Sequence, residues 1–443
     1  MKKFLSSKIF RAIWSIGLAA LFYFICPPCF NETFGKTTLP IILVILLFLI
    51  NGSSLIARSP WPTHIARFLV GGLFIFSGFI KANDPLGFSY KLQEYFEVFK
   101  GDTGLAMFEW CAHIALPLAI IICVSEMLLG VMLLIGYKRE LTLWLLFAQI
   151  AFFTFLTFYS ACYNKVTHCG CFGDFLQLKP WESFWKDIAL LILITMLFAG
   201  KEHINELMFP ALMGVVFIVA AVASIGFPMY AYRNLPPLDF RAYAIGMNIK
   251  DNMKPAGNYQ PAVYESGFTY ENLKTGELKD FTMKNYPWED TLNWKWNATK
   301  NILVHDAINP PKITDFTVNT LEGVNITDSL LNNKDYSFWL VCYDITKTED
   351  DASLQAKLND FYTLATKDGK KIVGMTSSGA KEIDDYKHGH QALYDFASVD
   401  GIVLKTMIRS NPGLILVKNG TVIMNWHWRN VPSYSEIKDK FMK

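Results

Sequence analysis

The chain has 443 residues, of which 52% are hydrophobic and 18% are charged, and its formal net charge is +2. This length is typical of two or three domains, and the high apolar content indicates membrane spans. Because the net charge is near zero and no long basic run occurs, nucleic acid is not an expected partner.

Long apolar runs lie almost entirely before residue 231, and seven of them approach the roughly 20 residues that a membrane helix needs. The predicted spans are 9–25, 39–57, 64–81, 112–136, 141–160, 184–200 and 209–229. The first is expected to remain a span, because Cys26-Pro27-Pro28-Cys29 stands where a cleaved leader has small residues. The lipid bilayer is therefore an expected partner.

The distribution of Lys and Arg favours a cytoplasmic N-terminus. On this orientation the cytoplasmic side holds Lys2, Lys3, Lys8, Arg11, Arg58, Arg67, Lys138, Arg139 and Lys201. The opposite loops hold Lys36, Lys81, Lys91, Lys100, Lys165 and Lys179. An odd number of spans then places residues 231–443 and the loop cysteines on the outer side, where disulfides are favoured.

Cys26 and Cys29 have the Cys-x-x-Cys spacing of thiol–disulfide exchange proteins. They follow the C-terminal end of a predicted span, where the helix dipole does not stabilise a thiolate. Redox use and a structural disulfide both remain open for this pair.

A second cysteine pair, Cys169-Gly170-Cys171, lies between the fifth and sixth predicted spans, and His168 precedes it. A bond between these two cysteines would be strained and easily reduced, and His168 could lower a thiol pKa or accept a proton. One interpretation is exchange with Cys26 and Cys29, and the other is a long-range disulfide that fixes the loop. A metal site using Cys162 as a further ligand is a third alternative, but the spacing is not that of a zinc site and no metal is predicted.

Glu126 lies near the middle of the fourth predicted span, where an ionisable group usually faces the protein interior or a cavity. Gln149 in the next span has a similar depth, and we expect the two side chains to touch. Glu126 and Gln149 could bind a proton or the headgroup of a quinone, the one cofactor that the sequence suggests. Alternatively, Glu126 is a hydrogen-bonded packing residue.

Residues 67–81 contain several small residues that would let a neighbouring helix approach closely. An Asp84-Pro85 turn follows, and an amphipathic stretch over 90–99 is expected along the outer interface. With Glu126 ahead of Gly130, and Cys-Gly-Cys-Phe-Gly before a Trp-rich sixth span, these segments resemble the DoxX-like superfamily, in particular its methylamine-utilisation (MauE) branch.

The resemblance covers about residues 60–200 and implies a four-helix membrane core. It also implies a bacterial inner-membrane protein that supports disulfide formation or maturation of periplasmic proteins, with Cys169 and Cys171 as functional residues. Relatives in the superfamily include quinone-linked oxidoreductase subunits, which agrees with a role for Glu126.

The region after residue 310 alternates strand and helix patterns. We expect an edge hairpin over 313–326, buried parallel strands at 336–343 and 371–375 with a helix at 353–365 between them, and a hairpin at 413–426. This order resembles a thioredoxin-like fold of the TlpA and peroxiredoxin type. The resemblance implies a cis bond between Asn411 and Pro412.

The outer domain departs from that family at its usual dithiol position. Residues 344–347 read Asp-Ile-Thr-Lys instead of Cys-x-x-Cys, and Cys342 is expected to be a buried structural thiol. A domain with one buried thiol cannot exchange a dithiol by itself.

The predicted organisation is therefore a helical membrane region followed by an α/β domain outside the cytoplasm. Its parts are two N-terminal spans (1–60), a four-helix core (61–200), a seventh span with linker (201–237), an irregular aromatic-rich segment (238–309) and a thioredoxin-like domain (310–443). The leading hypothesis is a membrane thiol–disulfide or quinone-linked redox component with a periplasmic client or redox partner. The alternative is a non-enzymatic scaffold whose thioredoxin-like domain binds a protein.

Overall fold

The computed structural model describes residues 59–442 except 164, 167–171, 177, 256, 277, 284, 306 and 349–350. The chain divides into two compact units, Met1–Arg241 and Ala242–Lys443. The first two predicted spans lie outside the described residues.

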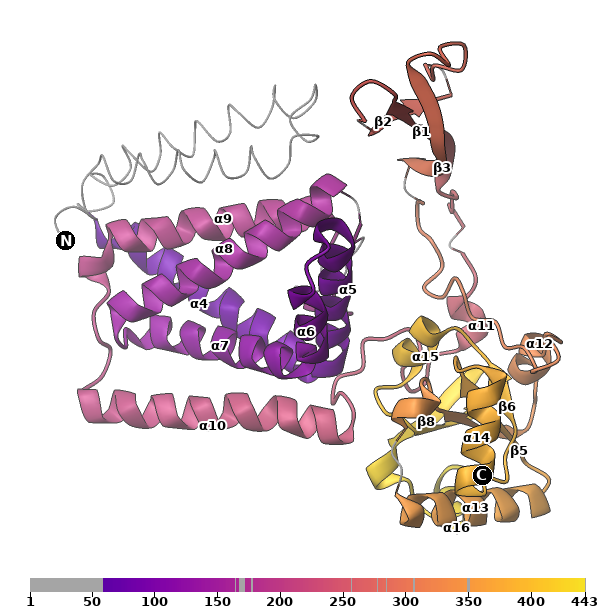
Figure 1. Cartoon of the computed structure of the whole chain (residues 1–443). Helices are drawn as coiled ribbons and strands as arrows, with labels where there is room; N and C mark the ends of the chain where they lie inside the picture. The colour runs from indigo at the N-terminus through magenta and orange to yellow at the C-terminus, as the bar shows by residue number, and fades with distance from the viewer. Residues whose placement is uncertain are drawn as a thin grey trace. The chain divides into compact units, whose positions relative to one another are not determined.

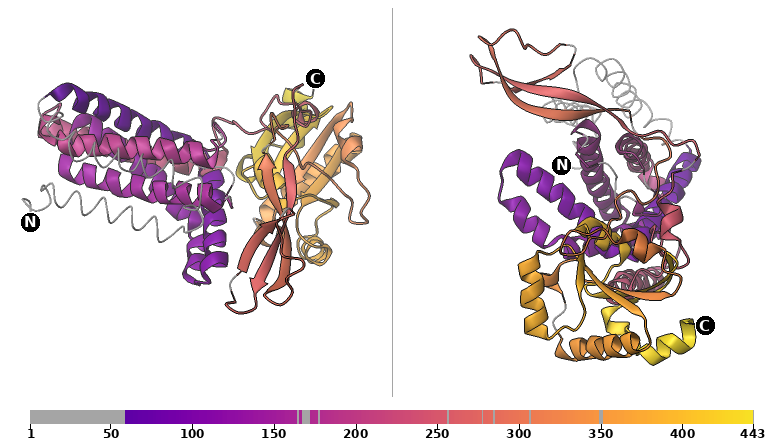
Figure 2. Two further views of the ribbon diagram at one scale, coloured as in Figure 1. Left: turned by 90° about the horizontal axis from the view of Figure 1, so that it is seen from above. Right: turned by 90° about the vertical axis from the view of Figure 1, so that its right-hand side faces the viewer.

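The first unit is helical (Figures 1 and 2). Its helices are α4 (Pro60–Asn83), α5 (Pro85–Thr103), α6 (Met107–His113), α7 (Ala115–Ile135), α8 (Arg139–Tyr163), α9 (Pro180–Ala199), the short η3 (Lys201–His203) and α10 (Pro210–Asn234). Helices α4, α7, α8 and α9 pack on one another, while α5 and α6 run across one end of this bundle and α10 lies along α7. The predicted core spans are thus helices at the expected places.

Four of these helices are long and apolar enough to cross a membrane, namely α4, α7, α8 and α10. Helix α9 forms where the sixth span is predicted, but Glu182, Lys186 and Asp187 lie in its first half. The amphipathic stretch after Asp84 is helix α5, whose N-terminus is capped by a hydrogen bond from the Gly87 amide to Asp84 Oδ1. Its aromatic face is buried against the bundle.

The second unit contains two sheets. The first sheet has the order β2-β1-β3 and is antiparallel, with β1 (Val263–Asn272), β2 (Leu278–Thr282) and β3 (Trp294–His305). The prediction of an irregular segment over 238–309 is therefore wrong. The strands share an aromatic face on which Phe281 contacts both Tyr270 and Trp294.

The second sheet has the order β6-β5-β4-β7-β8. Its strands are β4 (Tyr336–Val341), β5 (Lys371–Thr376), β6 (Phe396–Ser398), β7 (Gly413–Lys418) and β8 (Thr421–His427). β4, β5 and β6 are parallel, whereas β7 and β8 are antiparallel to their neighbours. The helices of this unit are α11 (Ile249–Asn252), α12 (Thr327–Leu331), α13 (Ala352–Lys367), α14 (Ala380–His390), α15 (Gly401–Met407) and α16 (Tyr434–Phe441), with short turns η4 (Ile345–Lys347) and η5 (Trp428–Asn430).

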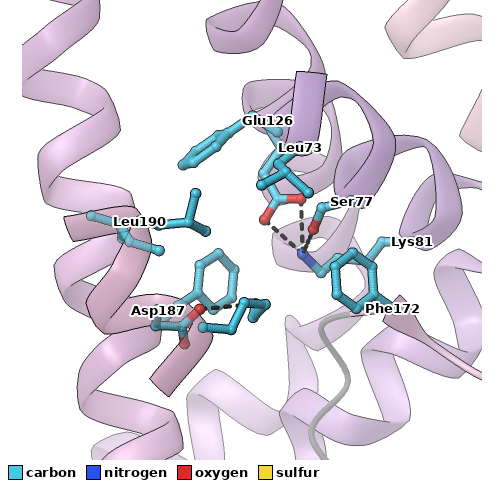
Figure 3. A pocket seen from close by; sticks show the side chains of 11 residues that line it. Leu73, Ser77, Lys81, Glu126, Phe172, Asp187 and Leu190 are labelled. Atoms are coloured by element: carbon cyan, nitrogen blue, oxygen red, sulfur yellow. Dashed lines mark hydrogen bonds and ion pairs between the residues drawn. The ribbon is translucent and has the colours of Figure 1, made fainter. Parts of the chain in front are cut away.

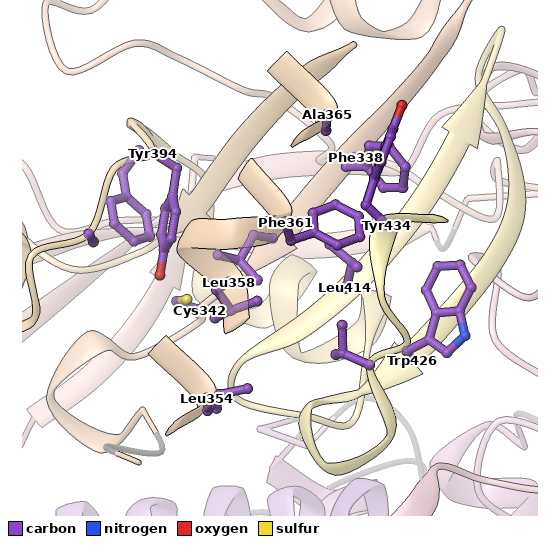
Figure 4. Close-up of a cluster of buried hydrophobic side chains, with 14 of the residues drawn as sticks. Phe338, Cys342, Leu354, Leu358, Phe361, Ala365, Tyr394, Leu414, Trp426 and Tyr434 are labelled. Carbon is purple, nitrogen blue, oxygen red and sulfur yellow. The ribbon is translucent and has the colours of Figure 1, made fainter. Parts of the chain in front are cut away.

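This sheet has the strand order and directions expected of a thioredoxin-like domain. Phe338, Leu340 and Cys342 alternate along β4 and its end, and they face an apolar core under α13, α14 and α16 (Figure 4). The parallel pairing and the hairpin are confirmed. The predicted edge hairpin over 313–326 contains no strand, but the segment turns back on itself through an isolated antiparallel bridge between Asn319 and Asn325, and a second bridge joins Asn319 to Ser398 of β6.

Candidate functional site

The site is positioned by the close approach of α4 and α7. A methyl group added at Gly78 would lie 2.8 Å from Met127 Cγ and 3.0 Å from the Cys123 carbonyl oxygen. A methyl group at Gly130 would lie 2.7 Å from the Gly71 carbonyl oxygen. Small residues let two helix backbones approach in this way, so the expectation from residues 67–81 is confirmed.

Lys81 of α4 and Glu126 of α7 form a buried ion pair at this contact (Figure 3). The Lys81 ammonium donates to Glu126 Oε1 at 2.6 Å, to Oε2 at 2.8 Å and to Ser77 Oγ at 2.8 Å. The Lys81 and Glu126 side chains are only 2% and 4% exposed. The ammonium also lies 4.8 Å from the centre of the Phe153 ring, a distance at which a cation is attracted to the ring face.

A second pair of charges lies on α9. Asp187 is 1% exposed, and its Oδ2 accepts a hydrogen bond of 3.0 Å from Thr157 Oγ1 of α8. Its Oδ1 lies 2.8 Å from the Lys186 ammonium but accepts no hydrogen bond from any described residue. Lys186 is itself 5.2 Å from the centre of the Phe172 ring.

The two pairs line one cavity of about 20 Å³, together with Phe172 and apolar side chains of α4, α8 and α9. This volume is enough for about one water molecule. Phe172 comes directly after Cys171 in the sequence, so a residue of the cysteine loop forms part of the cavity wall.

The charges of the cavity balance, with two lysines facing two carboxylates. Burying a single charge in a low-dielectric environment is very costly, whereas a hydrogen-bonded pair offsets much of that cost. The arrangement can therefore hold ionisable groups away from bulk solvent. Such a site is suited to storing or passing a proton.

The predicted partner of Glu126 is wrong. Its carboxylate pairs with Lys81, and Gln149 instead donates to Ser125 Oγ at 3.2 Å and to the Ile122 carbonyl at 3.5 Å. Gln149 does not line the cavity. The assignment of Lys81 to an outer loop is also wrong, because its side chain is buried within the helix bundle.

The predicted residues Cys26, Cys29, His168, Cys169 and Cys171 lie outside the described residues. Their neighbour Cys162, at the end of α8, is disulfide-bonded. A bonded sulfur is not available as a thiolate ligand, which weighs against the metal alternative that used it. Among the described residues, Cys111, Cys123 and Cys342 are free thiols.

The thioredoxin-like domain shows how the missing dithiol position is filled. The Asn411–Pro412 bond is cis, as expected, and Asn411 Nδ2 donates to the Asp344 carbonyl at 2.8 Å. Asp344 in turn caps the short turn η4 through the Thr346 amide. Cys342 is fully buried, and this burial raises its pKa to about 12, so the prediction of an inert structural thiol is supported.

Sequence reasoning missed Lys81, Asp187 and Lys186. Lys81 stands at the end of an apolar run, where a lysine normally reaches for the interface. Asp187 lies four residues into the predicted sixth span, and the rarity of carboxylates within spans was the signal that could have found it.

Comparisons with known proteins give separate matches for the helical unit and for the second unit. Residues 59–200 match the family model of methylamine utilisation protein MauE, and residues 264–306 match a domain of unknown function, DUF8463. The first match spans less than half of the chain and the second coincides with the three-stranded sheet. No curated protein matches the chain.

Three solved structures are similar to part of the chain. One is a solution structure described as a protein disulfide isomerase from Bacteroides thetaiotaomicron, with 11% identity, a TM-score of 0.24, and coverage of 28% of this chain and 82% of that one. The bacterioferritin comigratory protein of Xanthomonas campestris has 13% identity, a TM-score of 0.20, and coverage of 28% and 85%. PrxQ of Xylella fastidiosa has 13% identity, a TM-score of 0.21, and coverage of 28% and 86%. Residues 59–200 are therefore similar to MauE proteins. The thioredoxin-like topology of the second unit rests on its own strand order and directions.

Proposed function

We propose that the chain is a multi-pass protein of a bacterial inner membrane that exchanges thiols and disulfides in support of periplasmic protein maturation. The N-terminus lies inside the cell and residues 242–443 lie in the periplasm. The observation that carries the proposal is the cavity wall: Phe172 of the cysteine loop faces the buried Lys81–Glu126 pair and Asp187. Protected ionisable groups in contact with Phe172, which directly follows Cys171 in the sequence, support a role in proton-coupled exchange.

The proposed exchange takes place between two cysteine pairs, one of which is oxidised while the other is reduced. A thiolate of Cys169 or Cys171 attacks the disulfide of Cys26 and Cys29, and a mixed disulfide forms as the first S–S bond breaks. The second thiol then completes the new disulfide, and two protons pass to the released thiolates. A membrane quinone is the class of acceptor that would reoxidise the system, by taking up two electrons and two protons.

Differential alkylation with mass spectrometry tests the exchange in intact membranes. We expect the four cysteines to change redox state when the respiratory chain is inhibited, and the change to be lost in a Cys169→Ser/Cys171→Ser variant. Cys111→Ser is the matched control, because Cys111 is a free thiol of the same unit. Constant oxidation of all four cysteines, together with normal function of the double variant, would contradict the proposal.

A second candidate function is a scaffold whose outer domain binds a protein without redox chemistry. The observation in its favour is the buried Cys342, with a capped Asp-Ile-Thr-Lys turn where a dithiol would stand. A photo-crosslinker at the exposed Thr346 tests it, with the exposed Lys367 at the end of α13 as control. A discrete adduct from Thr346 alone, retained in the Cys169→Ser/Cys171→Ser variant, is expected of a scaffold.

A further inference from the structure

Helix α6 carries apolar side chains on two of its faces. Phe108, Cys111 and Ala112 pack against the core that α6 shares with α5, α7 and α8. The other face carries Met107 and Trp110, which are three residues apart and are 58% and 63% exposed. Because neighbouring helices leave this second face uncovered, it needs an apolar environment from outside the bundle.

The turn between α5 and α6 adds to this uncovered face. Gly104, with a φ of 69°, ends α5 in the left-handed conformation, and Leu105 directly after it is 53% exposed. On another side of the turn, the Lys100 ammonium of α5 lies 2.8 Å from the Glu109 carboxylate of α6. We call residues 104–110 the hairpin tip, which therefore combines an uncovered apolar face with a charged flank.

Helix α7 fixes the depth of the hairpin tip in a bilayer. It is long and apolar enough to cross a membrane, and its 21 residues span about 31 Å, which matches the thickness of the hydrocarbon core. Only Ile114 separates the end of α6 from the start of α7. The hairpin of α5 and α6 runs across the end of the bundle and reaches beyond its side in both views of Figure 2. At this depth the hairpin tip meets the lipid headgroups, where tryptophan is enriched.

We propose that the hairpin tip is a lipid-binding surface, in which Leu105, Met107 and Trp110 insert into the headgroup region beside the bundle. The exposed apolar surface continues from the tip onto α7, where Ile121 is 64% exposed on a membrane-crossing helix. This continuity favours lipid over a protein as the occupant, and a helix that lies in the plane of the interface with an apolar face is suited to it. The inference goes beyond the proposed function, because it involves neither the cysteines nor a redox partner.

Spin-label accessibility tests the proposal in the full-length protein, reconstituted in nanodiscs of phosphatidylethanolamine and phosphatidylglycerol. The nitroxide is attached to a noncanonical amino acid at position 107 or 109, so that the native cysteines stay unaltered. A label in place of Met107 should relax with molecular oxygen, which concentrates in lipid, more than with a water-soluble nickel chelate. Glu109 is the matched control, because its side chain is 55% exposed on the charged flank of the same helix and should respond mainly to nickel. Equal nickel accessibility at both positions would overturn the inference and indicate a surface for a protein partner.

Hydrogen exchange of peptides covering residues 104–113, in the same nanodiscs, gives a second readout that needs no label. Trp110→Asp should raise their exchange rates by about tenfold, because a large apolar side chain leaves the lipid and the hairpin tip opens more often. Glu109→Gln should leave the rates nearly unchanged, since it removes only an exposed ion pair. Peptides of α8 should exchange at the unaltered rate in both variants. Rates over 104–113 that do not change in Trp110→Asp would contradict the inference.

Discussion

At the scale of single residues, the Lys81–Glu126 pair shows why a membrane protein can keep two charges inside its bundle. Each charge alone would be expensive to bury, but the two are held at 2.6 Å with every ammonium proton donated. Removal of one partner leaves the other buried and unpaired, whereas removal of both leaves an apolar contact. The energetic role of the pair can therefore be separated from any chemical role.

We predict that Glu126→Gln destabilises the protein by about 3 kcal/mol, because Lys81 remains charged and loses its counter-ion. The double variant Lys81→Met/Glu126→Leu should be close to the unaltered protein in stability. Unfolding of the full-length protein by denaturant in detergent, followed by tryptophan fluorescence, measures both. A single variant as stable as the double variant would show that the pair is not ionised.

Only part of this site can be predicted from the sequence, because its residues differ in how clearly the surrounding sequence marks them. Glu126 is visible because a carboxylate in the middle of an apolar run stands out. Its partner is not, because Lys81 is separated from it by 45 residues and stands at a span end, where lysines are common. The prediction of Gln149 rests on its depth in the span alone, and depth does not say which face of a helix a side chain occupies.

At the scale of elements, the contact between α4 and α7 depends on which glycines face it. A methyl group added at Gly78 would point into the contact, whereas one added at Gly72 would meet nothing within 4 Å. The sequence shows a run of small residues but not which of them are at the interface. The structure distinguishes these residues by the direction in which an added methyl group would point.

We predict opposite effects of the same substitution at these two positions. Gly78→Ala should destabilise the bundle by about 1–3 kcal/mol, because the added methyl collides with Met127 and the Cys123 carbonyl. Gly72→Ala should be neutral or stabilising by up to about 1 kcal/mol, since alanine is the better helix former. Thermal unfolding of the full-length variants measures the difference, and equal effects at both positions would mean that α4 and α7 are not in this contact.

Element prediction was most successful where local patterns and packing agree. β4, β5 and the β7–β8 hairpin are buried on a single sheet, and their apolar runs stand between clear turn residues. The sheet of β1 to β3 was missed because it has few aliphatic residues. Its signal was the alternation of Tyr264, Phe268 and Tyr270 with Glu265, Thr269 and Glu271, a two-residue period typical of a strand.

At the scale of the whole molecule, the two units bury polar groups in different ways. The helical unit buries Lys81, Glu126 and Asp187 in ion pairs, whereas the second unit buries a histidine, His427, at the end of β8. His427 is 4% exposed, and its Nδ1 accepts a hydrogen bond of 3.2 Å from the Arg429 amide. The second unit should therefore respond to acid through this side chain.

Burial, and next the Arg429 charge, lower the pKa of His427 to about 4, whereas an unfolded histidine titrates near 6.5. Between these two values the unfolded chain binds a proton that the folded unit does not, so stability falls as pH drops from about 6.5 to about 4, by at most about 3 kcal/mol. Hydrogen exchange of β7 and β8 peptides in the full-length protein, corrected for the intrinsic rate at each pH, measures the loss. His427→Gln should remove this pH dependence, while His388→Gln, at a side chain 82% exposed, should leave it unchanged. A pH dependence that survives in His427→Gln would assign the acid response of this unit to its carboxylates.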